Sequence, residues 1–157
     1  MLTAQRAGWR GRVRVTSHLP DGTERLLLDT ENLITDDGLD QLATALRSSA
    51  ANAGRLRYLA WGDDTTPPVA GDSDLGNELG RVQVTSSVAG ATGVVVTTTY
   101  LSSTVIASIE ELGWYGGPLA SSTPGSGTLM ARVLFSHEKI AGESLQIERT
   151  DTLTRAV

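Results

Sequence analysis

Short segments rich in apolar and β-branched residues follow one another along most of this 157-residue chain, and clusters of Gly, Pro, Asn and Asp separate them. Residues 12–16 alternate strictly, as a strand with one buried face does, and a turn precedes residues 25–28. Further segments of this kind are residues 56–60, 82–85, 94–100, 105–112, 129–135 and 145–147. We expect residues 82–85 and 94–100 to pair as a long hairpin. The pattern predicts a β-rich fold.

Only residues 36–47 have the periodicity of an amphipathic helix. Its apolar residues at i, i+3, i+4 and i+7 are Leu39, Leu42, Ala43 and Leu46. We expect this face to pack inward, with Thr35 or Asp36 as the N-cap. The fold class predicted is therefore mainly β (a β-rich α+β fold), an antiparallel sandwich or barrel-like domain with one packed helix near residues 36–47.

The length and composition fit one globular domain. A chain of this size buries roughly 70% of its unfolded surface, so a single core is expected. Residues 1–9 have no periodicity and are predicted to form an N-terminal arm, followed by a single β-rich domain over residues 10–157. The first residues lack a signal-peptide pattern and no apolar run is long enough for a bilayer, so we expect no membrane partner.

The composition also argues against several function classes. The net charge of −5 argues against general nucleic-acid binding, which needs a basic surface, so no specific nucleic-acid partner is expected. The absence of cysteine excludes disulfides and thiolate metal sites. His18 and His137 lie far apart, and the chain has no nucleophile elbow, P-loop or dinucleotide motif. We predict that the chain is not an enzyme and that it has no catalytic residue and no cofactor.

Two groups of carboxylates are candidate sites. Asp63, Asp64, Asp72, Asp74 and Glu78 lie within one segment. Such a segment can bind a hard cation, but its spacing does not match a calcium loop, and Asp also stabilises turns, so no metal site is predicted. Glu110 and Glu111 are adjacent and would point to opposite faces of a strand, which does not suit a catalytic carboxylate pair. We expect one to be exposed and the other to pair with an arginine, Arg81 or Arg132.

Four segments in a fixed order carry a family resemblance. Residues 58–81 run from a strand ending at Gly62 through a Pro/Asp-rich loop to Leu-x-x-Glu-Leu-x-Arg, and residues 109–115 read Ile-Glu-Glu-Leu-Gly-Trp-Tyr. Residues 32–39 precede them and residues 127–132 follow them. Together they resemble the tail-collar fibre domains and related small structural proteins of bacteriophage virions.

The resemblance implies a non-enzymatic structural component of a bacteriophage virion, a tail, fibre-adaptor or collar-type protein assembled in the cytoplasm of the bacterial host. Its expected partners are other virion proteins and other copies of itself, with a trimer favoured. A trimeric capsid decoration protein is a close alternative. A carbohydrate-binding receptor-recognition module, with a host glycan as partner, is a further one and would use Trp114, Tyr115 and Glu111 on one exposed surface.

Five residues are candidates for interfaces: Arg6, Trp9, Arg10, Trp114 and Tyr115. The first three belong to an arginine-rich amino end that either docks on an acidic neighbour or forms a solvated strand face. Trp114 and Tyr115 are adjacent at the end of a predicted strand, so alternation places their rings on opposite sides. We expect at least one ring to face outward and to anchor an interface.

Overall fold

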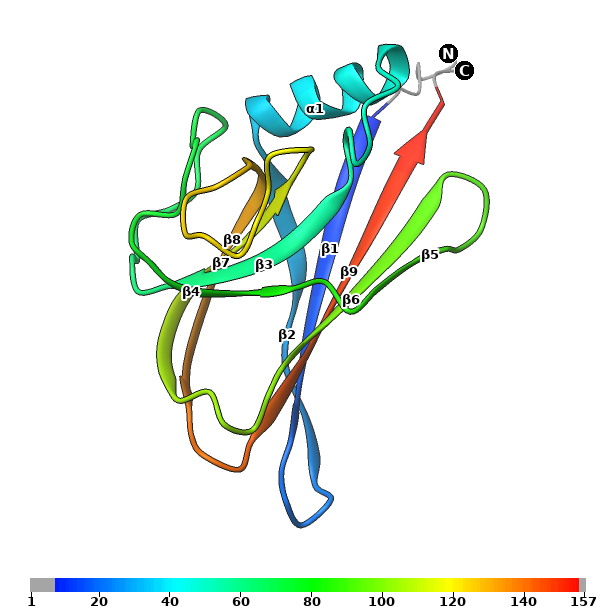
Figure 1. The fold of residues 1–157 in the computed structure, drawn as a ribbon. Helices are drawn as coiled ribbons and strands as arrows, with labels where there is room; N and C mark the ends of the chain where they lie inside the picture. Colours follow the sequence, from blue (N-terminus) through cyan, green and yellow to red (C-terminus); the bar gives the residue numbers. More distant parts are fainter. Residues whose placement is uncertain (1–7, 156–157) are drawn as a thin grey trace, which may run out of the picture.

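The computed structural model describes residues 8–155 and contains, in this range, nine strands and one helix (Figure 1). The elements are β1 (Gly8–His18), β2 (Glu24–Ile34), α1 (Asp36–Arg47), β3 (Leu56–Gly62), β4 (Glu78–Gln83), β5 (Ser86–Ala89), β6 (Val94–Leu101), β7 (Ala107–Gly116), β8 (Thr128–Lys139) and β9 (Ser144–Thr154). The prediction of a mainly β fold with one helix near residues 36–47 is confirmed.

All nine strands belong to one antiparallel sheet, in the order β4-β3-β7-β8-β2-β1-β9-β6-β5. The sheet curls into a half-barrel, which is the barrel-like form of the two architectures expected (Figure 1). Most of the core lies inside the curl, where residues from β1, β3, β6, β7, β8 and β9 form one cluster that includes Trp114. A smaller cluster of Ala60, Leu75, Tyr115 and Leu129 lies apart from it.

Strand β1 follows the predicted alternation. Val13 and Val15 are fully buried, whereas Arg12 and Arg14 are exposed on the other face. The strand begins at Gly8 and pairs Trp9 with Leu153 of β9, so the predicted arm over residues 1–9 is wrong for its last two residues. Residues 1–7 of that arm lie outside the described residues. Backbone pairing with β9 is what orders Gly8 and Trp9.

The predicted hairpin of residues 82–85 with residues 94–100 is wrong. Strand β4 pairs with β3, and it is β5 that pairs with β6. The chain changes partner between the two strands, because the N–H of Val84 donates to Arg57 (2.8 Å) and the N–H of Thr85 donates to Thr98 (2.9 Å). The sequence pattern located β4 and β6 but missed β5 (Ser86–Ala89), and it did not determine which edge of the sheet each strand joins.

The helix begins as predicted, with the Thr35 hydroxyl accepting a hydrogen bond from the N–H of Gly38 at 2.9 Å. Its predicted inward face is wrong: Leu39 is 49% exposed and Leu46 is 86% exposed. Gly38 is instead the buried residue, and a Cβ there would clash with the backbone of Met130 in β8. The helix therefore contacts the sheet closely through its first turn, and this close approach turns much of its apolar stripe toward solvent.

Candidate functional site

The four segments that carry the family resemblance meet at one end of the half-barrel. The hydroxyl of Thr35, from the first segment, donates to the carbonyl of Leu129 in the fourth at 2.6 Å, and its N–H donates to Met130 (3.1 Å). From the fourth segment, Arg132 donates to Glu111 in the third at 2.7 Å. Segments distant in the sequence are thus joined by side-chain and backbone hydrogen bonds.

Glu111 is the centre of this network. It is fully buried in β7, and its carboxylate accepts hydrogen bonds from the backbone N–H groups of Gly76 (3.2 Å) and Asn77 (3.0 Å). The guanidinium of Arg132 provides the third donor and is itself 98% buried. The prediction that one of the two adjacent glutamates pairs with Arg81 or Arg132 is confirmed for Arg132, and Glu110 is the partly exposed member. Glu111 therefore fixes the loop after β3 onto β7.

The acidic loop between β3 and β4 makes contacts with donors of the protein itself. Asp72 lies 3.1 Å and Asp64 lies 3.4 Å from the guanidinium of Arg132. The backbone N–H and hydroxyl of Thr66 donate to Asp64 and lower the pKa of its carboxyl. Asp63 accepts from the side chain of Asn77 at 2.7 Å. Residues 8–155 contain no group of three His, Cys, Asp or Glu side chains arranged to hold a metal ion.

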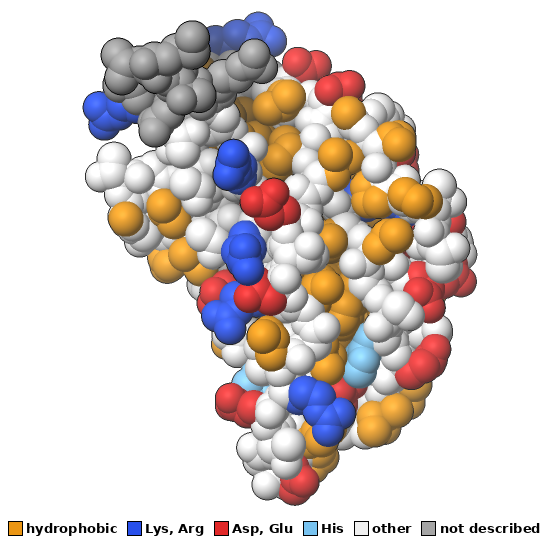
Figure 2. All heavy atoms as spheres, turned by 180° about the vertical axis from the view of Figure 1, so that it is seen from behind, with side chains coloured by type: hydrophobic (Ala, Val, Ile, Leu, Met, Phe, Trp, Pro, Cys, Tyr) orange, Lys and Arg blue, Asp and Glu red, His pale blue; other side chains and the backbone are white. Residues whose placement is uncertain are grey.

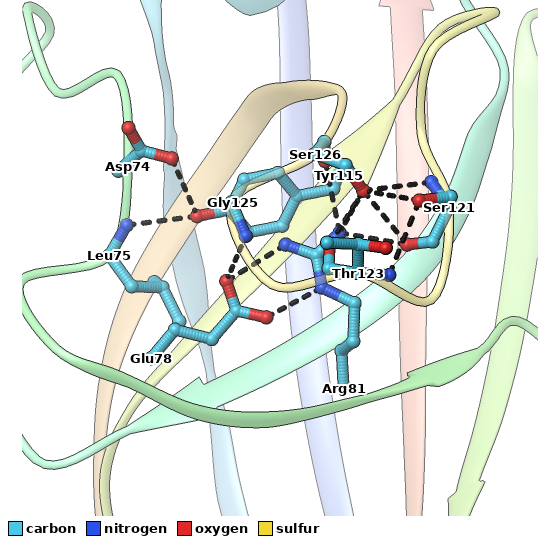
Figure 3. Close-up of polar contacts among 9 residues, drawn as sticks. All are labelled: Asp74, Leu75, Glu78, Arg81, Tyr115, Ser121, Thr123, Gly125 and Ser126. Carbon is cyan, nitrogen blue, oxygen red and sulfur yellow. Dashed lines mark hydrogen bonds and ion pairs between the residues drawn. The ribbon is translucent and has the colours of Figure 1, made fainter.

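Tyr115 lies beneath the same loop (Figure 3). Its hydroxyl accepts from the N–H of Leu75 at 3.0 Å and donates to Asp74 at 3.3 Å. Burial, more than any charge nearby, raises the pKa of the Tyr115 hydroxyl. The guanidinium of Arg81 covers the ring, with its central carbon 4.3 Å from the ring centroid, and forms a double ion pair with Glu78 at 2.5 and 2.8 Å.

Arg81 and Glu78 also fix the loop between β7 and β8 (Figure 3). Arg81 donates to the carbonyl oxygens of Ser121 (3.1 Å) and Ser126 (2.9 Å), and Glu78 accepts from the N–H of Gly125 at 3.0 Å. Both side chains of the ion pair are nearly buried. Arg81 and Glu78 thus connect β4 to the loop after β7.

The expectation that Trp114 or Tyr115 faces outward is wrong. Trp114 is 1% exposed and Tyr115 is fully buried. The two rings do belong to different clusters, Trp114 to the core inside the half-barrel and Tyr115 to the smaller one. The exposure was mispredicted because the loops before β4 and after β7 fold over the ring of Tyr115. Neither aromatic is available as a surface anchor for an interface or a glycan.

Strand β9 carries a buried charge that sequence reasoning missed. Arg149 is fully buried, pairs with Asp151 at 2.6 Å, and lies between two indoles, 5.7 Å from the ring centroid of Trp9 and 5.2 Å from that of Trp114. Burial lowers the pKa of Arg149. Trp9 donates its indole N–H to Asp151 at 2.6 Å. The alternation of Leu145, Ile147, Arg149 and Asp151 along β9 is the sequence signal that points these charges inward.

A second buried charged cluster lies near the other end of the barrel. Lys139 is 1% exposed and donates from Nζ to the carbonyls of Val105 (2.7 Å) and Glu143. Burial lowers the pKa of Lys139. The carboxylate of Glu143 accepts from Ser17 at 2.5 Å and lies 2.9 Å from Nε2 of His137. The bond between Ser17 and Glu143 connects the β8–β9 turn to β1, and Lys139 connects β8 to that turn and to the segment before β7.

The remaining interface candidates lie near the start of β1. Trp9 is half-buried by its contact with Asp151, and Arg10 is exposed on the convex face; Arg6 lies outside the described residues. Arg10 borders a surface groove of about 620 Å³ with Arg155 and threonines of β9. Further along this face Arg12 pairs with Asp29 at 2.7 Å. Figure 2 shows the result as a column in which blue and red side chains alternate.

Comparisons of this chain with protein-family models, with curated proteins and with solved structures find no match. Within residues 8–155, no helix is both long enough and apolar enough to cross a bilayer.

Proposed function

We propose that this chain is a non-enzymatic structural component of a bacteriophage virion, of the tail, fibre-adaptor or collar type, and that it assembles as a homo-oligomer. The main support is the way the four resemblance segments use their residues. Thr35, Glu111 and Arg132 connect the segments to one another through buried hydrogen bonds. The residues of the resemblance segments thus hold loops in place, and such a role suits a family of structural proteins.

The contacts of the buried charged side chains support the same proposal. Buried arginine, lysine and carboxylate side chains in the core and under the loops are bound to one another or to backbone groups. General acid–base or nucleophilic chemistry needs such groups within reach of a substrate. Leu46 (86%) and Leu119 (83%) are among the large apolar side chains that the described residues expose.

The residues required by the glycan-binding alternative are not at the surface. It needed Trp114, Tyr115 and Glu111 together on an open surface, and all three are buried. The capsid-decoration alternative uses the same features as the tail role, so position on the particle separates the two.

The test is the protein composition of purified particles. Phage encoding this chain is banded on a density gradient, and peptides of the chain are quantified against the major capsid protein by mass spectrometry. We expect the chain in the particle band in several copies, and an oligomer in light scattering of the purified protein. Recovery only from the soluble lysate, with a monomer in solution, would contradict the proposal.

A further inference from the structure

Strands β2 and β8 are joined at one end only. Their pairing consists of Leu33 with Arg132 and Ile34 with Ala131. Below this point β2 continues to Glu24 beside β1, and β8 continues to Lys139 beside β7. Residues 24–32 of β2 and 133–139 of β8 therefore have, within the described chain, no strand partner on the sides that face each other. We call this opening the β2–β8 split, and the two strands diverge visibly in Figure 1.

The split has an apolar interior. At its upper end a pocket of about 340 Å³ is bordered by Leu28, Leu33, Val133, Leu134 and Pro68 of the covering loop, and Thr30, Glu31 and Arg132 complete its lining. Figure 2, which views the molecule from behind, shows apolar side chains down the middle of this face, beside the column of alternating blue and red side chains. Two unpaired strand edges beside apolar side chains form a surface onto which an extended segment can add.

We propose that the β2–β8 split binds residues 1–7 of a second copy of this chain as an added β-strand. This contact would join the copies of the homo-oligomer, so it rests on the oligomeric part of the proposed function. The segment contains no proline, so it can donate backbone hydrogen bonds along its length. It contains no acidic residue and carries Arg6, whereas Glu31 lines the pocket and Glu24 and Glu138 lie exposed on the two strands, where they contact His18 and Ser108.

The side-chain spacing sets a register. Leu2 and Arg6 are four residues apart, as are Leu134 and Glu138 on β8. Residues four apart lie on the same face of a strand, and Leu134 is half-buried while Glu138 is exposed. A segment running beside β8 in this register places Leu2 next to Leu134 and Arg6 next to Glu138. Such cross-strand apolar and opposite-charge pairs stabilise a sheet.

A second copy fits the split better than the segment's own chain. Gly11 of β1 pairs with Asn32, which is next to the Leu33 contact that closes the split. The first residues of β1 therefore lie beyond the joined end of the split, and β1 itself lies on the other side of β2. Residues 1–7 of the same chain would have to reverse direction and cross β2. The same residues of another copy enter through the open end.

The absence of cysteine makes the contact testable by cross-linking. Leu2→Cys and Leu134→Cys are introduced into two differently tagged full-length copies, which are mixed and mildly oxidised. Leu119→Cys is the matched control, since Leu119 is 83% exposed and lies in the loop between β7 and β8. We expect the Leu2–Leu134 disulfide to exceed the Leu2–Leu119 disulfide by about tenfold, because docking raises the local concentration of the thiols.

Equal yields of the two disulfides would overturn the proposal. A double variant with both cysteines in one chain that forms an intramolecular disulfide at high dilution would also overturn it, because the segment would then fill its own split. Arg6→Glu should lower the intermolecular yield and Glu138→Arg should restore it; an unchanged yield would refute the register. Particle composition is a separate measurement, so a missing cross-link in a chain that copurifies with particles rejects only this inference.

Discussion

Replacement of Glu111 by alanine should destabilise the fold strongly. Glu111 is fully buried and Arg132 is 2% exposed, and removing one partner of such a pair leaves the other charge uncompensated at a cost of about 3–5 kcal/mol. The N–H groups of Gly76 and Asn77 lose their acceptor as well. Asp72 and Asp64 stay within reach of Arg132 and offset part of the loss, so we expect the variant near the lower end of this range.

The matched control is Glu110→Ala, because Glu110 is the next residue along β7, is partly exposed, and has no ion-pair partner within the described residues. Such a surface change alters the free energy of unfolding by about 0.5 kcal/mol or less. The free energy of unfolding of both variants is measured by urea denaturation. In a thermal melt, a loss of about 3 kcal/mol corresponds to a fall of roughly 6–12 °C in Tm for a chain of this size. A loss for Glu111→Ala within 1 kcal/mol of that for Glu110→Ala would refute the central role given to the carboxylate.

Three further outcomes are expected. Tyr115→Phe leaves the N–H of Leu75 without its acceptor and should cost about 1–3 kcal/mol at neutral pH. Because the folded pKa of Tyr115 is raised, wild type loses stability as the pH rises above the ordinary value near 10, so the difference should shrink there in denaturation series. Burial opposes ionisation of Glu143, but hydrogen bonds from Ser17 and His137 lower its pKa on balance, so wild type should lose stability below about pH 4.5 and Glu143→Gln should lose less over the same titration. Gly38→Ala should destabilise by about 1–3 kcal/mol in thermal melts despite its higher helix propensity, because the added Cβ meets the backbone of Met130. Unchanged pH profiles, or a stabilised Gly38 variant, would contradict these assignments.

Local features of the fold could be predicted from the sequence. Alternation along residues 12–16 located β1, and the cap at Thr35 located the start of the helix, because both depend on neighbouring residues only. The prediction that a glutamate of β7 pairs with either Arg81 or Arg132 was also correct, and the partner is Arg132.

Long-range features could not be predicted. Whether β4 joins β3 or β6 depends on the partner change at Val84, and nothing in the local pattern encodes it. The helix was assigned the wrong inward face because Gly38, with no side chain, allows a closer approach than the leucines do. Tyr115 was expected at the surface because a period of two gives the face of a strand but not the loops that cover it.

The charged interior was missed for a related reason. Arg149 and Lys139 are residue types that usually lie in solvent, yet Arg149 is buried against Asp151 of its own strand and the indoles of two other strands, and Lys139 is buried against carbonyls of two turns. Their inward positions are consistent with alternation along β9 and β8, but the partners that make burial tolerable come together only in the folded sheet.

The proposed virion role is tested most directly by a cryo-electron microscopy map of the intact particle. The account predicts density that fits the nine-stranded half-barrel in several symmetry-related copies at the tail or its collar, with extended density between β2 and β8 of each copy. Copies on the capsid surface would favour the decoration role. A particle map that accounts for every ordered protein without this half-barrel would contradict the proposed function.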